Sequence, residues 1–234
     1  MKFHDLLNKT TKSTATPASL TVRNLIILDA SGSMQLIYTQ ALTGVNETLQ
    51  TIRQAAADNS DMPQTVTLST FSTMGFNNIY DNVAAGNATD INPRQFCPNG
   101  GTPLYDAIGR GIQTMEKVKR PEDSVLVTIV TDGEENSSVE FTGQAIRSLI
   151  EQKRSQGWVF TYIGANQNVV EVAESLSIKH SLAFAATASG TADMWMHENN
   201  SRRNFYSNLK GKMARMAADP NAAPAQADDE DFSF

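Results

Sequence analysis

The chain is poor in cysteine and has no long apolar segment. Only one of its 234 residues, Cys97, is a cysteine, which excludes a framework of internal disulfides and fits a reducing compartment. No apolar run approaches the roughly 20 residues that a membrane-spanning helix needs. Residues 1–16 are polar and lack the apolar centre of a signal peptide. These absences predict a cytoplasmic protein with no membrane partner.

Basic charge is also scarce, and the acidic charge is unevenly placed. The chain carries 19 Lys and Arg against 25 Asp and Glu, which gives a net charge of −6. Five of the acidic residues fall within residues 218–234, which contain no Lys or Arg, so the preceding 217 residues have a net charge of only −1. This composition does not indicate the basic, phosphate-neutralising surface that direct nucleic-acid binding requires.

Hydrophobic periodicity predicts one domain over residues 20–190. Short apolar, β-prone runs, such as residues 25–28 and 125–130, alternate with segments whose apolar residues recur at helical spacing. Strands that alternate with helices of this length predict an α/β fold, with a doubly wound, mostly parallel sheet and helices on both faces. Residues 1–19 are rich in Thr, Ser and Lys, which predicts a flexible N-terminal extension.

The composition changes after residue 190. Residues 191–217 combine five Lys and Arg with interspersed Met, Phe and Leu. This pattern predicts a basic helical extension, of one helix or two, that packs on the domain or on a partner. Residues 221–227 contain Ala and Pro and have the composition of a linker. Residues 218–234 as a whole are therefore predicted to form a disordered, acidic C-terminal tail.

Three short stretches, far apart in the chain, contain oxygen-bearing side chains. Residues 29–33 (Asp-Ala-Ser-Gly-Ser) and 131–133 (Thr-Asp-Gly) each follow a predicted strand, and residues 100–103 (Gly-Gly-Thr-Pro) precede a helical pattern. Sites in open α/β sheets lie outside the carboxyl ends of the strands, so the three stretches are expected to converge. The candidate metal ligands are two carboxylates and three hydroxyls: Asp29, Ser31, Ser33, Thr102 and Asp132.

Hard oxygen ligands of this kind suit Mg²⁺, with Mn²⁺ as a second possibility. Mg²⁺ prefers six oxygens and retains water wherever protein ligands are lacking. Because hydroxyls are neutral ligands, a site with only two carboxylates stays short of negative charge. Such a site favours a carboxylate from another molecule, which suits binding better than hydrolysis.

The three stretches resemble the von Willebrand factor type A (vWA) domain. Residues 29–33, 100–108 and 131–134 match its metal-ion-dependent adhesion site, and the spacing covers roughly residues 20–185. The resemblance implies a mainly parallel α/β sheet with one antiparallel edge strand. It also implies that the open coordination position of the metal takes an Asp or Glu side chain from a protein partner.

The resemblance implies a role for each candidate ligand. Ser31, Ser33 and Thr102 would bind the metal directly, whereas Asp29 and Asp132 would bind it directly or through water. Every position of the family's signature is present in the chain. The resemblance therefore predicts a metal-dependent protein-interaction module that is not an enzyme.

An enzyme is the first alternative, because carboxylates and Mg²⁺ at strand ends also serve phosphoryl chemistry. A metal-assisted phosphotransferase or hydrolase needs a nucleophile or general base beside the metal. Residues 29–33 lack the second early Asp that phosphoaspartate enzymes of similar architecture carry, and Cys97 has no nearby His in the sequence. The sequence therefore favours binding over catalysis.

The acidic tail supports a second alternative. Residues 228–234 (Asp-Asp-Glu-Asp-Phe-Ser-Phe) place aromatic residues after an acidic run. They resemble the tips of single-stranded DNA-binding proteins, which dock replication partners. The chain would then be an accessory protein of nucleic-acid machinery, recruited through its tail. The tail could instead fold back onto the metal or onto the basic residues 202–215.

Overall fold

A six-stranded sheet forms the centre of the computed structural model, which describes residues 20–165, 168–219 and 225–234. The strand order is β3-β2-β1-β4-β5-β6, and every neighbouring pair is parallel except β2 and β3. The antiparallel strand therefore lies at one edge, and the predicted fold class is confirmed. The strands are β1 (Val22–Asp29), β2 (Gln64–Ser72), β3 (Gly75–Ala84), β4 (Ser124–Thr131), β5 (Trp158–Ala165) and β6 (His180–Phe184).

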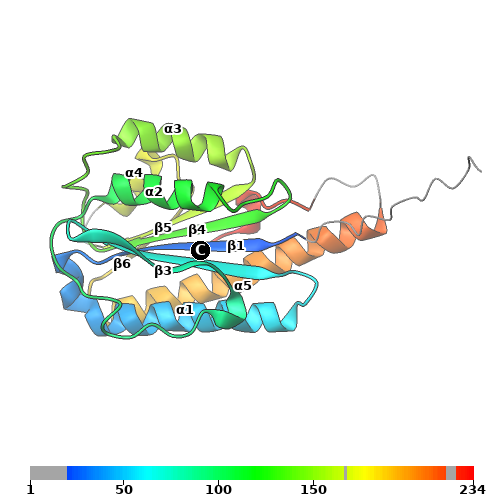
Figure 1. The fold of residues 1–234 in the computed structure, drawn as a ribbon, viewed down its shortest axis with the longest axis horizontal. Helices are drawn as coiled ribbons and strands as arrows, with labels where there is room; N and C mark the ends of the chain where they lie inside the picture. The colour runs from blue at the N-terminus through cyan, green and yellow to red at the C-terminus, as the bar shows by residue number, and fades with distance from the viewer. Residues whose placement is uncertain (1–19, 166–167, 220–224) are drawn as a thin grey trace, which may run out of the picture.

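Helices cover both faces of the sheet (Figure 1). One face packs against α1 (Tyr38–Asp58) and α5 (Ala188–Ala218), and the other against α2 (Leu104–Glu116), α3 (Gly143–Arg154) and α4 (Val169–Ser175). Three short 3-10 turns complete the described elements: η1 (Gly32–Ile37), η2 (Ala85–Asn87) and η3 (Asp229–Asp231).

The two helical layers explain why the central strands are apolar along their whole length. Ile26 and Leu28 of β1 belong to the core on the α1 and α5 side, whereas Leu25 and Ile27 belong to the core on the α2 side. Successive side chains of a strand point to opposite faces, so a strand covered on both faces has no position left for a solvated residue.

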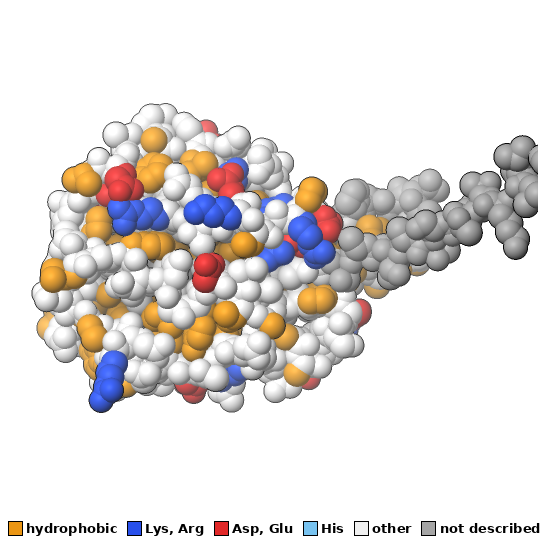
Figure 2. All heavy atoms as spheres, in the orientation of Figure 1, with side chains coloured by type: hydrophobic (Ala, Val, Ile, Leu, Met, Phe, Trp, Pro, Cys, Tyr) orange, Lys and Arg blue, Asp and Glu red, His pale blue; other side chains and the backbone are white. Residues whose placement is uncertain are grey.

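The surface carries charges of both signs. On the face shown in Figure 2, most Lys and Arg side chains lie beside Asp or Glu side chains. Ion pairs of this kind join Arg110 to Glu140 and Arg147 to Glu151. On this face, basic side chains do not merge into one continuous patch, in keeping with the nearly neutral composition of the domain.

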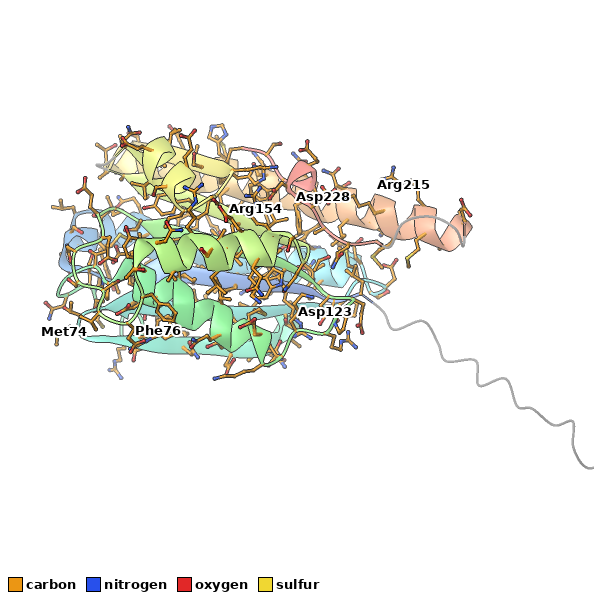
Figure 3. All side chains as sticks on the ribbon, turned by 90° about the horizontal axis from the view of Figure 1, so that it is seen from above. Met74, Phe76, Asp123, Arg154, Arg215 and Asp228 are labelled. Atoms are coloured by element: carbon orange, nitrogen blue, oxygen red, sulfur yellow. The ribbon has the colours of Figure 1, made fainter. Side chains whose placement is uncertain are left out.

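The two edges of the sheet where strands begin and end lie at opposite ends of the molecule. Figure 3 shows Met74 and Phe76 near the edge where the parallel strands end, and Asp123 near the edge where they begin. We call these the carboxyl edge and the amino edge.

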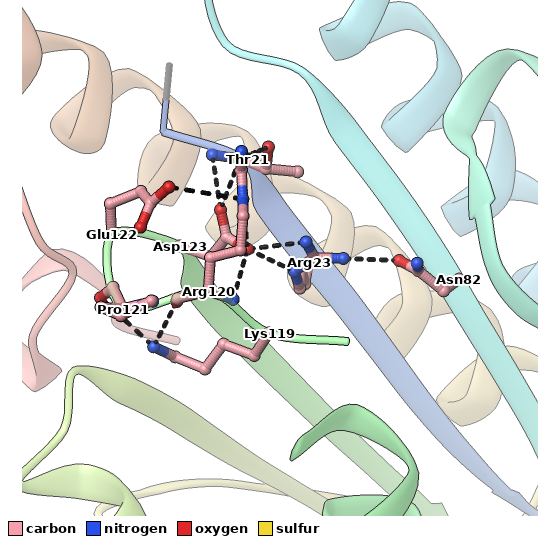
Figure 4. Close-up of polar contacts among 8 residues, drawn as sticks. All are labelled: Thr21, Arg23, Asn82, Lys119, Arg120, Pro121, Glu122 and Asp123. Atoms are coloured by element: carbon pink, nitrogen blue, oxygen red, sulfur yellow. Dashed lines mark hydrogen bonds and ion pairs between the residues drawn. The ribbon is translucent and has the colours of Figure 1, made fainter. Parts of the chain in front are cut away.

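A buried carboxylate ties the strands together at the amino edge (Figure 4). Asp123 Oδ2 accepts hydrogen bonds from Arg23 Nε at 2.7 Å and from the Arg120 amide at 2.9 Å, and its Oδ1 accepts from the Thr21 amide at 3.3 Å. Burial by itself would raise the pKa of Asp123, but the bonds from Arg120 and Arg23 lower it below its ordinary value. These contacts fix the loop before β4 to the start of β1, which holds the two strands in register.

Helix α5 is longer and more central than the predicted basic extension. It is one helix that begins before residue 190, so the predicted boundary between domain and extension falls inside it. Its Trp195 and Phe205 are buried in the main core beneath the sheet. Residues 191–217 therefore belong to the folded domain, because their apolar face completes one layer of it.

The predicted disorder of the acidic tail is wrong for residues 225–234. Ala225, Ala227 and Phe232 are buried against the domain. Asp228, Asp229 and Asp231 of this segment form ion pairs with Lys and Arg side chains of the folded body, so most of the charge that predicted disorder is neutralised locally. The predicted N-terminal extension, residues 1–19, lies outside the described residues. Within the described part of the chain, no helix is both long and apolar enough to cross a membrane.

A buried ion pair holds α5 onto the sheet. Arg202 and Glu198 are both fully buried and paired, and Arg202 also donates to Asn24 Oδ1 of β1 at 2.9 Å and to Thr128 Oγ1 of β4 at 2.8 Å. Burying a guanidinium is tolerated because four acceptors, including the Glu198 carboxylate and the Tyr206 hydroxyl, surround it.

We predict that Arg202→Met lowers the free energy of unfolding by about 3–5 kcal/mol, because it leaves the Glu198 carboxylate buried without its counter-ion. Replacing both partners, as Arg202→Met with Glu198→Leu, is expected to recover most of that loss. Urea denaturation of the two variants and the wild type measures both values. Equal stability of the single variant and the wild type would contradict a structural role for the pair.

Candidate metal centre

The fold brings all three oxygen-bearing stretches to the carboxyl edge. Asp29 is the last residue of β1, and Asp132 follows the last residue of the neighbouring strand β4. Ser31 and Ser33 lie at the start of η1. Thr102 lies two residues before α2. The predicted convergence is therefore confirmed, because adjacent parallel strands end side by side.

The side-chain oxygens form a connected chain. Ser33 Oγ donates to Asp132 Oδ1 at 2.7 Å, and Ser31 Oγ lies 3.1 Å from Ser33 Oγ. Oxygens that occupy neighbouring positions around an octahedral Mg²⁺, with metal–oxygen distances of about 2.0–2.1 Å, are separated by about 2.9 Å. The observed spacings therefore fit ligands that share one small cation.

A glycine keeps the space beside Thr102 open. A Cβ atom placed on Gly133 would lie 3.3 Å from Thr102 Oγ1 and 3.5 Å from Ser33 Oγ. Two hydroxyls that come from different segments thus face the same small space. A side chain at this position would point into the gap between them.

Burial makes the two carboxylates difficult to ionise. Asp29 and Asp132 are almost fully buried. Burial raises the pKa of Asp29 to about 6, although hydrogen bonds from Thr131 and Ser31 oppose this effect, and the negative charge of Asp132 adds to it. Burial likewise raises the pKa of Asp132 above its ordinary value. A divalent cation between the two groups would offset both the desolvation and the mutual repulsion.

The loop that carries Thr102 is held by neighbouring backbone. Gly32 N donates to Gly100 O at 2.9 Å, and Thr73 Oγ1 accepts from Gly101 N at 2.9 Å. Gly100 has a positive φ of 83°, and a Cβ there would lie only 2.3 Å from Thr73 Oγ1. Glycine is therefore required at residue 100 both for the backbone conformation and for the close approach of Thr73.

Two residues that position the ligands were not assigned this role from the sequence. Thr131 Oγ1 donates to Asp29 Oδ2 at 2.6 Å, while the Ser31 amide donates to Asp29 Oδ1 at 2.6 Å. Asn136 Oδ1 accepts from the Thr102 amide at 2.9 Å. Thr131 stands within the third motif, but its spacing alone does not distinguish a ligand from a residue that orients one.

The loop after the third motif is also more ordered than a solvated turn. Glu135 accepts from the Tyr105 amide at 3.0 Å, and Asp106 accepts from the amides of Val139, Glu140 and Phe141, each at 2.9 Å. Pro103 caps α2 without a side-chain hydrogen bond. Because Pro103 offers no side-chain acceptor, the free backbone amides at the start of α2 need acceptors from another segment. The proline before this helix was therefore the signal in the sequence that polar residues elsewhere must contact the helix start.

The donor set fits a hard divalent cation. It offers three hydroxyls and two carboxylates, all oxygen, from segments whose backbone is fixed by hydrogen bonds. Among the residues that the structure describes, no group of three or more His, Cys, Asp and Glu could form a different centre. The mixed set at the carboxyl edge is therefore the candidate metal centre.

No protein-family model and no curated protein matches the sequence. Solved structures do match. The pilus adhesin SpaC from Lactobacillus rhamnosus GG aligns over 77% of this chain and 30% of its own, with 15% identity and a TM-score of 0.58. The SpRpn10 VWA domain aligns over 76% of this chain and 95% of its own, with 11% identity and a TM-score of 0.51. The chain has the vWA fold.

A third match agrees with this assignment. The vWF domain of the type V pili tip protein Mfa5 from Porphyromonas gingivalis aligns over 77% of this chain and 96% of its own. Its identity is 8% and its TM-score is 0.52. At such low identity these matches establish the vWA fold alone, so the metal ligands remain a prediction from this chain's own residues.

The pH dependence of stability tests the buried state of Asp29. Because the pKa of Asp29 is about 6 when folded and 3.8 when unfolded, the folded protein retains a proton between these values that the unfolded chain has lost. The stabilisation that Asp29 contributes is fully present below pH 3.8 and is lost as the pH rises through about 6. In EDTA we expect the free energy of unfolding to fall by up to about 3 kcal/mol over that range.

The matched control is Asp29→Asn, whose side chain does not titrate. The fall is expected in the wild type relative to this variant, and it should shrink in saturating Mg²⁺, which stabilises the ionised carboxylate. Urea denaturation at about pH 4, 5, 6 and 7 measures the difference. Parallel pH profiles for the two proteins would show that Asp29 is not held in this environment.

Proposed function

We propose that the chain is a protein-interaction module whose bound Mg²⁺ accepts an Asp or Glu side chain from a protein partner, with Mn²⁺ as a possible substitute. The observation that carries this proposal is the meeting of Ser31, Ser33, Thr102, Asp29 and Asp132 at one point of the carboxyl edge. When bound, the metal would supply a positively charged coordination position for the incoming carboxylate.

The contacts support a division of labour among the five residues. In this proposal, Ser31, Ser33 and Thr102 bind the metal directly. Both oxygens of Asp29 already accept short hydrogen bonds, which favours a role through water for this residue. Asp132 contacts Ser33 and adds the second negative charge. With neutral hydroxyls as its direct protein ligands, the cation would stay electron-poor at its open coordination position and would attract a partner's carboxylate.

The surface around the centre supports a protein partner. Three large apolar side chains lie exposed in its loops: Leu36 in η1, Met74 after β2 and Val139 in the loop after β4, at 80%, 71% and 90% exposure. Met74 lies against Gly100, and the Val139 amide is bound to Asp106 at the start of α2. Exposed apolar side chains grouped at one end of a molecule are typical of interaction surfaces.

Binding is a better proposal than catalysis for this centre. The motif residues include no His or Lys, so the metal-holding carboxylates themselves would have to act as the general base. The neighbour SpaC is named a pilus adhesin, although this chain spans only 30% of it. Its name is compatible with a binding role and carries no further weight for this chain.

Replacing one hydroxyl tests the proposal. Thr102→Ala is expected to weaken Mg²⁺ binding at least about tenfold and to abolish partner capture, because it removes a ligand and leaves the backbone intact. Thr102→Ser is the matched control, since it keeps the hydroxyl. Calorimetry with MgCl₂ measures the metal, and affinity capture from the source lysate, with Mg²⁺ or EDTA, measures the partner.

Two outcomes would contradict the proposal. Equal Mg²⁺ affinity of Thr102→Ala and wild type would show that the Thr102 hydroxyl is not a metal ligand. Partner capture that persists in EDTA, or in Thr102→Ala with Mg²⁺, would move the interaction to another surface. Melting temperatures of both variants in EDTA show whether the fold is retained.

A further inference from the structure

The C-terminal segment, residues 225–234, lies at the amino edge, opposite the candidate metal centre. The Ala227 amide donates to Ser124 Oγ at the start of β4 at 3.1 Å, and Gln226 Nε2 donates to Gln156 O just before β5 at 3.1 Å. Figure 3 shows Asp228 and Arg154 far from Met74. The segment therefore does not reach the candidate metal centre, although it does meet the basic part of α5.

Three cations from separate parts of the fold converge on this segment. Arg154 Nε, at the end of α3, donates to Asp229 Oδ2 at 3.1 Å, and Lys179 Nζ, just before β6, lies 3.2 Å from the same oxygen. Lys212 Nζ, on α5, lies 2.8 Å from Asp228 Oδ2 and 2.6 Å from Asp231 Oδ2. Within the described residues, Lys179 and Lys212 form ion pairs with carboxylates of this segment alone. Without the segment, the surface would carry a cluster of positive charge.

An aromatic socket adjoins the cations. Phe232 is only 2% exposed, and its ring centroid lies 5.5 Å from that of His180 and 6.3 Å from that of Phe205. Phe234 packs edge-on against Phe232 and is 36% exposed. We call the surface formed by Arg154, Lys179, His180, Phe205 and Lys212 the C-terminal seat.

The bound segment holds its own local shape. The Asp228 amide donates to Asp231 Oδ2 at 3.0 Å, and Asp228 Oδ1 accepts from the Glu230 amide at 2.9 Å. These bonds close a capping box around η3, which orders the acidic residues before Phe232. A short peptide can form such a turn by itself, because its bonds span only three residues.

We propose that the C-terminal seat is a binding site for an acidic–aromatic peptide, filled by the chain's own residues 225–234 and able to take the same segment from a second copy of the chain. Exchange replaces every contact by an identical one, so the bound copy loses no ion pair and no aromatic packing. The chain's own segment prevails at low concentration because its connection to α5 gives it a high effective concentration. Since the seat and the candidate metal centre lie at opposite edges, this proposal does not depend on the proposed function.

Two complementary full-length variants test the exchange. In the first, Phe232→Ser with Asp229→Asn disables the segment and leaves the seat intact. In the second, Arg154→Glu with Lys212→Glu disables the seat and leaves the segment intact and released. Each variant alone is expected to be monomeric in analytical ultracentrifugation. An equimolar mixture is expected to form a one-to-one complex, because the released segment finds the vacant seat.

The complex should respond to competition and to salt. Excess synthetic peptide of residues 225–234 is expected to dissociate the one-to-one complex, whereas the same peptide with Phe232→Ser should leave the complex intact. Raising NaCl from about 50 to 500 mM is expected to weaken the complex at least about tenfold, because partly exposed ion pairs are screened. If Phe232→Ser lowers the melting temperature sharply, Asp229→Asn with Asp231→Asn replaces it and keeps the aromatic residue.

Two results would overturn the proposal. Failure of labelled peptide to bind the segment-disabled variant, with its melting temperature unchanged, would show that the seat is not a peptide site. Peptide binding without a complex in the mixture would exclude the second copy as occupant and would assign the seat to an acidic–aromatic segment of another protein.

Discussion

The buried guanidinium of Arg202 is the contact on which the arrangement of this domain depends. It joins α5 to Asn24 of β1 and Thr128 of β4, the two central strands that end at the candidate metal centre. The Tyr206 hydroxyl donates to the same Asn24 at 2.6 Å, and burial raises the pKa of Tyr206 to about 12. A buried charge is stable only where hydrogen-bond partners surround it in the right geometry. This cluster therefore fixes the position of α5 on the sheet more strictly than apolar packing alone would.

The two edges of the sheet gather opposite kinds of chemistry. At the carboxyl edge, buried oxygens meet with little positive charge among their hydrogen-bond partners, which suits an incoming cation. At the amino edge, Asp123 and the C-terminal carboxylates are matched by cations of the same chain. Together, the two proposals describe a protein that binds one partner through a metal at one end and keeps a second, peptide-binding surface at the other.

Much of the fold and of the candidate site could be predicted from local patterns. Apolar residues recur every two residues in a half-buried strand and every three to four residues in a helix, so the sequence indicates where these elements lie. Two of the candidate ligand motifs follow predicted strands, and the third precedes a predicted helix. Other parts could not be predicted in this way. Asn136 orients Thr102, and Asp106 holds the loop at residues 139–141, through contacts that leave no periodic trace.

The sequence by itself determined the alternation of strands and helices and which side chains could bind a hard cation, because both are local properties of residue type and spacing. Only the tertiary structure decided that residues 225–234 pack at the amino edge and that α5 completes the core. The acidic run predicted disorder because its partners, Arg154 and Lys179, are 75 and 50 residues away from Asp229 in the chain. Charge pairing over such separations exists only after the sheet has formed.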